Sequence, residues 1–264
     1  MSGPSRPAAV AEGLGPPLAF GALFLAAWET FVRARHIKPY FLPRPSAVWG
    51  ELHGNAGLIV RAARVSGTNA LVGLLLGTLV GVLVAFAASR FRVVERLVTP
   101  MAVAVSAMPI IVVASVLYNM LSIDSQVPRR IMATIVVFFV VFVNVAKGLT
   151  EVTATQTELM RSYAASDSDI LRKVRVPNAL SHLFVALRVA APVAVVTAFV
   201  SEYFGGRQDG LGSRIASNIS NSRNAVAWAY VAGAILLGLT FYVAAVVVER
   251  LAMPWQARRG RLGT

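Results

Sequence analysis

Few side chains in this sequence are arranged for catalysis or metal binding. The histidines His36, His53 and His182 do not share the spacing of metal ligands, and cysteine is absent. No nucleophile elbow of the Gly-x-Ser-x-Gly type occurs. The glycine-rich stretch 205–212 lacks the Gly-Lys-Ser/Thr ending of a phosphate-binding loop and follows an apolar run rather than a strand. We therefore expect no catalytic site, no metal site and no cofactor in this chain.

The polar residues with the most regular spacing lie in the stretch 155–177, between two apolar segments. Thr155 and Glu158 have the spacing of a capping box, which predicts that a short helix begins there. Ser166 and Asp169 repeat this signal and predict a second short helix. The stretch is therefore expected to form two helices joined by a tight junction.

Pro177 is expected to end the second helix, because proline disfavours the α conformation of the residue before it, here Val176. One side of this helix is apolar and the other is basic: Ile170, Leu171 and Val174 against Arg172, Lys173 and Arg175. A basic two-helix elbow at a membrane surface is suited to docking another protein.

The composition places the chain in a membrane. Of its 264 residues, 56% are hydrophobic and only 14% are charged, and the mean hydropathy is +0.67. The net charge of +13 would suggest nucleic acid as the partner of a soluble protein. Here we expect lysine and arginine to flank membrane helices and to meet anionic lipid headgroups, and we expect no nucleic acid partner.

The apolar segments predict an all-α fold, a polytopic bundle of about six transmembrane helices. A spanning helix needs about 20 apolar residues. The candidate segments are 13–28, 65–88, 97–123, 131–146, 183–201 and 225–248. They form one membrane domain, residues 13–255, between an N-terminal tail, residues 1–12, and a C-terminal tail, residues 256–264. The N-terminal segment is interpreted as a retained anchor rather than a cleaved signal.

A stripe of glycines marks one helix face in the second segment. Gly73, Gly77 and Gly81 recur every four residues, which lets two helix backbones approach closely. This predicts helix packing either inside the subunit, the favoured reading, or between subunits.

The stretch 155–177 resembles the cytoplasmic loop in permease subunits of bacterial ATP-binding-cassette (ABC) importers, whose pattern begins with Glu-Ala-Ala, passes through Gly and ends with Ile and Leu-Pro. The matching positions are Glu158 for Glu, Ala164 for Gly, Val174 for Ile, and Val176-Pro177 for Leu-Pro, with Leu159-Met160 replacing Ala-Ala. Because alanine adopts a positive φ only at a cost, the sequence argues against a sharp left-handed turn at residue 164 but not against a tight junction.

More of the chain is similar to one branch of these permeases, the branch for nitrate, sulfonate, taurine and pyrimidine precursors. The resemblance is carried by Leu42-Pro43-Arg44-Pro45, Val48-Trp49, Pro100, Pro109, Phe138-Phe139, Gly148-Leu149, Ala186-Leu187-Arg188, Glu202 and Gly210-Leu211-Gly212. The chain departs from its relatives at Ser115, Ser122, Val140 and Ser181, where they have Pro, Gly, Pro and Pro.

The resemblance implies a type I importer permease in the cytoplasmic (inner) membrane of a bacterium. Its partners would be a second permease subunit, identical or paralogous, an ATPase subunit that binds ATP and Mg²⁺, and an extracytoplasmic solute-binding protein. The residues implied to contact the ATPase are Glu158, Leu159, Met160, Arg161, Tyr163, Ala164, Ala165, Ser166, Asp167 and Pro177. The solute would be nitrate-, sulfonate- or taurine-like, or a pyrimidine or vitamin precursor.

The resemblance also places the third and fifth spans along the solute pathway. Pro109 and Pro192 remove a backbone donor inside these spans and are expected to kink them. The candidate pathway residues are Met108, Pro109, Tyr118, Asn119, Pro192 and Glu202. Ordinary helix packing is an equal alternative for Met108, Tyr118 and Asn119.

Charged residues inside or beside the spans have competing readings. Glu29 is expected among the headgroups, and Arg188 could extend toward the cytoplasmic surface. Glu202 could steer solute, pair with a cation of the binding protein, or bind Arg207 or Arg214, and we favour a pair within the chain.

Two other classes of function remain open at this point. A secondary carrier would work without an ATPase, but such carriers often show inverted repeats and buried acids, which the sequence lacks. A membrane scaffold that transports nothing is the other alternative, and the missing prolines and glycine add weight to it. Lysine and arginine are divided almost evenly between the two sides, so the orientation depends on the stretch 155–177 facing the cytoplasm.

Overall fold

A computed structural model describes residues 6–106 and 108–254 of the protein. It describes side chains from residue 15 onward, except those of residues 92, 99, 102, 103, 105 and 106. The predicted C-terminal tail, residues 256–264, lies outside the described residues. The predicted N-terminal tail, residues 1–12, overlaps a helix from Arg6 onward.

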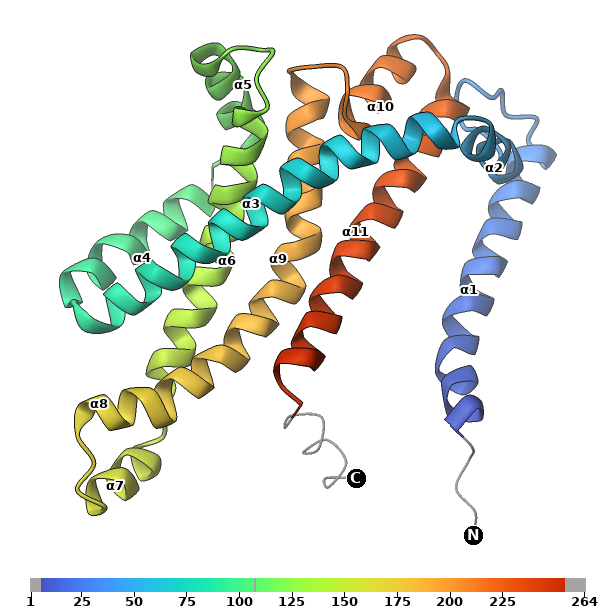
Figure 1. Ribbon diagram of the computed structural model, residues 1–264. Helices are drawn as coiled ribbons and strands as arrows, with labels where there is room; N and C mark the ends of the chain where they lie inside the picture. The colour runs from blue at the N-terminus through green and yellow to red at the C-terminus, as the bar shows by residue number, and fades with distance from the viewer. Residues whose placement is uncertain (1–5, 107, 255–264) are drawn as a thin grey trace.

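The described part of the chain is helical and holds no strand, which confirms the all-α prediction (Figure 1). Its elements are α1 (Arg6–Ala34), α2 (Pro45–Gly54), α3 (Ala56–Arg90), α4 (Arg92–Ser106), α5 (Ile110–Leu121), α6 (Val127–Thr150), α7 (Ala154–Ser162), α8 (Asp167–Ile170), a π-helical turn (Leu171–Arg175), α9 (Val176–Phe204), α10 (Leu211–Ser220) and α11 (Asn224–Ala252).

Within the described ranges, five helices are long and apolar enough to cross a membrane, and α5 is a shorter apolar helix. The five are Gly15–Ala34, Ala56–Arg90, Val127–Thr150, Asp167–Phe204 and Asn224–Ala252. A polytopic membrane bundle is therefore confirmed, although one of the six predicted spans has a different form.

The span predicted over residues 97–123, with interruptions at Pro100 and Pro109, is divided into two helices at the second proline. Helix α4 ends at Ser106 and α5 begins only at Ile110. Pro109 has no amide hydrogen to donate and lies in an extended conformation, with φ −62° and ψ 115°, at the start of α5. Pro100, in contrast, is accommodated inside α4. The second proline therefore separates two helices instead of kinking one.

The centre of the bundle is formed by α3, α6 and α9, and the glycine stripe of α3 lies against α6. A Cβ atom at Gly73 would lie 2.3 Å from Cβ of Ala133, and one at Gly77 would lie 2.7 Å from the carbonyl oxygen of Thr134. At Gly81 the nearest backbone oxygen of α6 would be 3.0 Å away. The structure therefore places all three glycines at a contact inside the subunit, where two backbones meet.

This contact predicts that Gly77→Ala destabilises the bundle. The added methyl group would overlap α6 backbone, and overpacking of this kind costs about 1–3 kcal/mol. Gly238→Ala in α11 is the matched control, because no atom lies within 4 Å of its added methyl group. Thermal unfolding of the two variants in the same detergent should show a lower midpoint for Gly77→Ala alone. Equal midpoints would contradict the packing argument.

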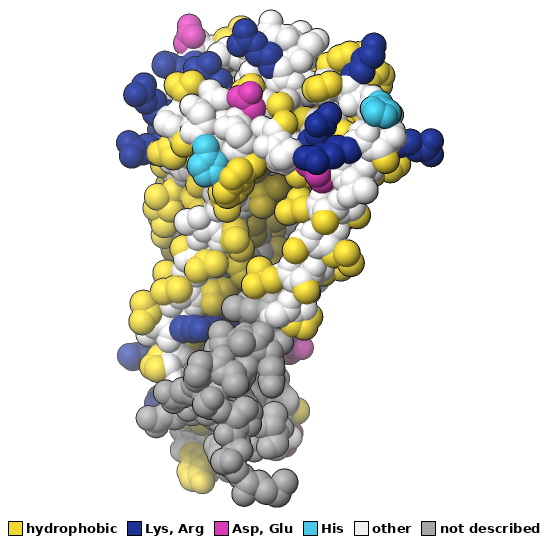
Figure 2. Space-filling view, turned by 90° about the vertical axis from the view of Figure 1, so that its right-hand side faces the viewer, with side chains coloured by type: hydrophobic (Ala, Val, Ile, Leu, Met, Phe, Trp, Pro, Cys, Tyr) yellow, Lys and Arg dark blue, Asp and Glu magenta, His cyan; other side chains and the backbone are white. Residues whose placement is uncertain are grey.

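The two ends of the bundle carry different elements. Helices α7 and α8 lie at one end, together with the last turn of α11, and helices α2, α5 and α10 lie at the opposite end (Figure 1). Figure 2 shows an apolar band below a rim of lysine and arginine side chains at the end that carries α2 and α10. This distribution suits a membrane protein, because the band can face lipid and the rim can face headgroups and water.

Helix α1 stands apart from the central helices and is joined to them near α2 (Figure 1). The carboxylate of Glu29 accepts hydrogen bonds from the amide and hydroxyl of Ser46 at 3.0 and 2.9 Å, and it pairs with Arg33 at 2.8 Å. The indole rings of Trp28 and Trp228 meet edge-on, with centroids 5.2 Å apart. Glu29 therefore fixes the corner between α1 and α2.

Candidate functional site: a coupling loop and a buried polar cluster

The first helix of the stretch 155–177, which we call the coupling loop, starts from a capping box that lies two residues before the predicted one. The hydroxyl of Thr153 accepts from the amide of Gln156, and the side chain of Gln156 accepts from the amide of Thr153, both at 3.3 Å. The prediction of a start at Thr155 with Glu158 is therefore wrong by two residues. The sequence offers two overlapping boxes, and the earlier one starts α7 at Ala154.

The junction between α7 and α8 is a left-handed turn at Ala164, whose φ is 54°. The amide of Ala164 donates to the carbonyl of Arg161 at 2.9 Å, and the amide of Ala165 donates to that of Met160 at 3.1 Å. These two bonds form a Schellman motif, which satisfies the last carbonyls of α7. The argument against a left-handed turn here is therefore wrong, because the two bonds and the capping box that follows compensate the cost of the conformation.

A glycine at this turn should stabilise the coupling loop. Ala164→Gly removes the clash of Cβ in the left-handed conformation and should raise the free energy of local unfolding by about 1 kcal/mol. Ala165→Gly is the control, because the φ of Ala165 is not positive and the change only adds backbone freedom. Hydrogen exchange of the α7 amides should slow in Ala164→Gly and not in Ala165→Gly. Faster exchange in both variants would contradict the turn.

The second predicted start is confirmed. The hydroxyl of Ser166 accepts from the amide of Asp169 at 3.2 Å, and the Asp169 carboxylate reaches back to the Ser166 amide at 3.3 Å. Lys173 adds an ion pair with Asp169 at 2.9 Å, one helical turn further on. Helix α8 is therefore well anchored at its first turn despite its short length.

Pro177 does not end this helix as predicted. Val176 is right-handed helical, with φ −64° and ψ −47°, and its amide donates to the carbonyl of Leu171, five residues back. This π-helical turn widens the backbone just before Pro177, which then lies in the first turn of α9, where a missing amide hydrogen is tolerated. The coupling loop therefore runs into α9 as one helical rod, Asp167–Phe204.

The outer surface of the coupling loop is open. Helix α7 buries none of its residues, and the side chains of Leu159 and Tyr163 are 56% and 76% exposed. Two exposed apolar side chains beside a tight turn form a surface that another protein could cover. Pro177 lies in α9. The other predicted contact residues lie on α7, in the turn and at the start of α8: Glu158, Met160, Arg161, Ala164, Ala165, Ser166 and Asp167.

At the opposite end of the bundle, Arg129 of α6 is fully buried. Its guanidinium donates to Asp209 and Gln126, both at 2.8 Å, and to the hydroxyl of Tyr118 at 3.3 Å. It also donates to the backbone carbonyl of Arg207 at 2.5 Å. Arg129 therefore ties α5, α6 and the loop after α9 together.

Glu202, near the end of α9, is the second buried charge in this cluster, so the expectation that the chain holds no buried acid is wrong. One carboxylate oxygen accepts from the hydroxyl of Ser66 at 2.6 Å and from the amide of Gly212 at 3.1 Å. The other oxygen lies 3.8 Å from the guanidinium of Arg129 and has no hydrogen-bond partner among the described residues. Glu202 thus links α9 to α3 and α10.

The expected partners of Glu202 were different. Arg207 pairs instead with Asp209 at 2.9 Å, and Arg214 is exposed. The favoured pair within the chain exists, but the cation is Arg129. Glu202 was also expected to face the pathway, and its side chain faces no open space within the described part of the subunit.

This cluster accounts for the glycine-rich segment that follows α9. A Cβ atom at Gly210 would lie 2.2 Å from the carboxyl carbon of Glu202, and one at Gly212 would lie 2.1 Å from the carbonyl oxygen of Phe199. The glycines therefore let the chain approach Glu202 and the end of α9. Their role is packing around a buried carboxylate.

Asp209 lies in the loop between α9 and α10. Partial burial raises the pKa of its carboxyl, but the hydrogen bonds and charges of Arg129 and Arg207 outweigh this effect and hold the pKa below its ordinary value. Asp209 therefore remains ionised and paired with Arg129.

Sequence reasoning missed Arg129, because Arg129 and Arg130 stand together at the edge of an apolar segment and resemble ordinary flanking charges. Arg130 is partly exposed and donates to the side chain of Asn69 at 3.1 Å. The available signal was the pair of acids, Glu202 and Asp209, at the end of another span, since two acids near a membrane boundary need a cation.

Of the six candidate pathway residues, Tyr118 and Glu202 both contact Arg129, but the structure does not bring all six together. Tyr118 is buried, and its hydroxyl contacts the hydroxyl of Ser201 at 3.1 Å. Asn119 is exposed and donates to the carbonyl of Ser115 in its own helix at 2.8 Å. Pro192 lies inside α9, which continues through it.

Met108 lies beside a small apolar cavity between α5 and α6. The cavity has a volume of about 270 Å³. It is lined by Met108, Ile110, Val113, Met132, Ile135, Val136, Phe139 and Val140.

Arg188, which could have extended toward the cytoplasmic surface, is paired inside the bundle. It forms an ion pair with Glu249 of α11, whose side chain is buried. The pair links α9 to α11 nearer the coupling-loop end. Charged pairs thus occur at the middle of α9, at Arg188, and near its end, at Glu202.

The bundle, its apolar band and its exposed loop define a polytopic helical membrane protein. The chain belongs to the family described as binding-protein-dependent transport system inner membrane component, whose model matches residues 77–254, more than half of the chain. It is a permease component of a binding-protein-dependent ABC importer and a multi-pass protein of the cytoplasmic membrane.

Individual relatives agree with this assignment. The chain is 29% identical over 201 residues to a probable ABC transporter permease protein of Haemophilus influenzae, covering 74% of this chain and 79% of the relative. It is 28% identical to the formylaminopyrimidine transport permease protein ThiX of Halalkalibacterium halodurans, covering 92% and 96%. It is also 28% identical to the riboflavin transport system permease protein RibX of Chloroflexus aurantiacus, covering 92% and 91%.

Proposed function

We propose that this chain forms one half of the pathway for a small solute and that its coupling loop docks in a separate ATPase subunit. The observation that carries the proposal is the continuity of α8 with α9 in one rod, Asp167–Phe204, behind an exposed two-helix surface. A partner that moves the loop would move α9 with it, because no flexible segment separates them.

The ATPase would bind ATP and Mg²⁺, and this chain would supply the docking surface. The apolar side chains Leu159 and Tyr163 would enter a groove of the ATPase, and Arg161 would lie at its rim. Approach of two ATPase subunits on ATP binding would then shift α9 against α6, and the bundle would alternate between two packing arrangements. Because the ATPase would lie in the cytoplasm, the coupling loop would face the cytoplasm as well.

The solute is proposed to be a small heteroaromatic compound, such as a pyrimidine or a vitamin precursor. The names of two relatives, which transport formylaminopyrimidine and riboflavin, favour this choice over nitrate, sulfonate or taurine. The apolar cavity beside Met108, Met132 and Phe139 would suit a flat ring. Thermal shift of the cognate binding protein with formylaminopyrimidine, riboflavin, taurine and nitrate would decide between them.

Reconstitution tests the function as a whole. Proteoliposomes that contain this chain, its second permease subunit and the ATPase should take up solute only when ATP and the binding protein are both supplied. Uptake without the ATPase would instead indicate a secondary carrier. Uptake that persists when this chain is omitted would indicate a scaffold.

A further inference from the structure

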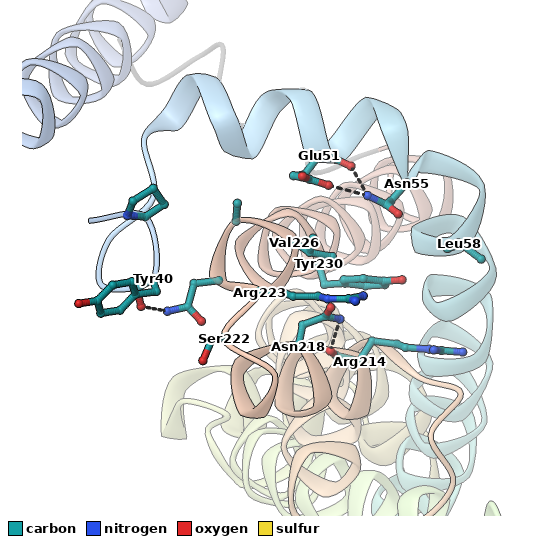
Figure 3. Close-up of a pocket in the computed structure, with 13 residues that line it drawn as sticks. Tyr40, Glu51, Asn55, Leu58, Arg214, Asn218, Ser222, Arg223, Val226 and Tyr230 are labelled. Carbon is teal, nitrogen blue, oxygen red and sulfur yellow. Dashed lines mark hydrogen bonds between the residues drawn. The ribbon is translucent and has the colours of Figure 1, made fainter. Parts of the chain in front are cut away.

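A cavity of about 830 Å³ lies at the end of the bundle opposite the coupling loop. It is enclosed by α2, the first turns of α3, α10 and the first turns of α11 (Figure 3). Most of its lining groups are polar or charged, among them Arg214, Asn218, Arg223, Glu51 and Asn55. The cavity is therefore built for a polar occupant rather than for a lipid chain.

The backbone of the two arginines is fixed by α10 and by the turn that follows it. Arg214 and Asn218 are one helical turn apart, and the Asn218 side chain donates to the Arg214 carbonyl at 2.7 Å. At the end of α10, the amide of Arg223 donates to the Asn218 carbonyl at 2.9 Å and the amide of Ser222 donates to that of Ile219 at 3.0 Å. Ser222 has a φ of 57°, so this Schellman turn aims Arg223 at the cavity.

Neither guanidinium has an acidic partner within the described residues, whereas Arg33, Arg129, Arg188 and Arg207 all pair with carboxylates. The cavity's acid, Glu51, accepts a hydrogen bond from the Asn55 side chain at 2.9 Å on the opposite wall. Figure 3 shows Arg214 and Arg223 extending toward the same side of the cavity, below Glu51 and Asn55. Two positive charges therefore outnumber one negative charge there.

Carboxylates and phosphates both suit a cavity lined by two guanidinium groups, because their oxygens accept paired hydrogen bonds, and a protein partner presents carboxylates. The family requires a binding protein, and such a protein must approach the end of the bundle away from the ATPase. We propose that this cavity receives acidic side chains of the extracytoplasmic solute-binding protein. This proposal depends on the proposed function, which sets the orientation of the bundle.

The cavity is also connected to the polar cluster. Helix α10 carries Arg214 on its exposed side and Gly212, whose amide is bound by Glu202, on its buried side. Glu202 ends the rod that begins at the coupling loop. Docking of a protein at the cavity would therefore act on α9 from one end, and the ATPase would act on it from the other.

The test measures binding of the purified, labelled binding protein encoded with this importer to the complete complex in nanodiscs. Arg214→Glu and Arg223→Glu should each weaken binding by about tenfold or more, and the double variant should weaken it further. Arg44→Glu is the matched control, because Arg44 is an exposed arginine at the same end that does not line the cavity. ATPase activity without the binding protein should be unchanged in all variants, since both arginines lie far from the coupling loop.

Wild-type affinity in the double variant would overturn the proposal, and so would an equal loss in Arg44→Glu. The same measurement in nanodiscs of phosphatidylcholine alone distinguishes a lipid site. If the arginine variants lose affinity for the binding protein only when anionic lipid is present, the cavity binds lipid headgroups instead. If the wild-type complex itself binds no binding protein, the proposed function fails, and that result is distinct from any difference between variants.

Discussion

Ala164→Trp in the coupling loop should lower ATP-driven uptake by proteoliposomes at least about tenfold, a loss of roughly 1.4 kcal/mol of coupling. Ala164 is exposed at the turn between α7 and α8, next to Tyr163. An indole at this position would project from the surface proposed to enter the ATPase groove and would prevent its close fit. ATP hydrolysis should continue, because this chain is proposed to hold no part of the nucleotide site.

Two further variants separate this effect from general damage. Tryptophan and alanine meet similar backbone strain at positive φ, so Ala164→Gly, which relieves that strain, should keep full uptake. Ala154→Trp adds the same bulk at the other end of α7, outside the proposed contact, and should reduce uptake far less. Unchanged uptake in Ala164→Trp, or an equal loss in Ala154→Trp, would contradict the proposed contact.

The membrane bundle could be predicted because its signals are local and repeated. Uncharged segments of sufficient length appear in sequence order, and the Gly73, Gly77 and Gly81 stripe indicates a close helix contact without further information. The Ser166 cap is similarly a signal within four residues. Each of these features depends on residues that are neighbours in the sequence.

The features that were predicted wrongly are those in which two local rules compete. Thr153 and Thr155 both satisfy the rule for a helix start, and only the geometry selects the first. Pro177 can end a helix or begin one, and the π-helical turn before it decides. At Ala164, the cost of a positive φ is outweighed by two backbone hydrogen bonds that propensity rules do not count.

The buried polar cluster could not be predicted, because its members come from distant parts of the chain. Arg129 and Asp209 are 80 positions apart, and Ser66 and Glu202 are 136 apart. A single sequence shows that each charge lies near a membrane boundary but not which charges meet. The cavity lined by Arg214 and Arg223 is hidden in the same way, since four helices enclose it.

Arg129→Leu should destabilise the protein by about 3–5 kcal/mol, the usual effect of removing one member of a buried charged network. The substitution leaves Glu202 without its only ion-pair partner among the described residues and removes the guanidinium from Asp209, while Glu202 remains fully buried. Thermal unfolding in detergent should show the loss directly. Because the cluster ties α6, α9 and α10 together, uptake should fall as well.

The neighbouring Arg130→Leu is the matched control. Arg130 is partly exposed and makes one hydrogen bond to Asn69, so its loss should cost only about 1 kcal/mol. Replacing Glu202 by Gln in the Arg129→Leu background should recover part of the stability, because an uncompensated buried charge is then removed. If Arg129→Leu unfolds no more easily than Arg130→Leu, the cluster does not hold this end of the bundle together, and α10 would need another connection to α9.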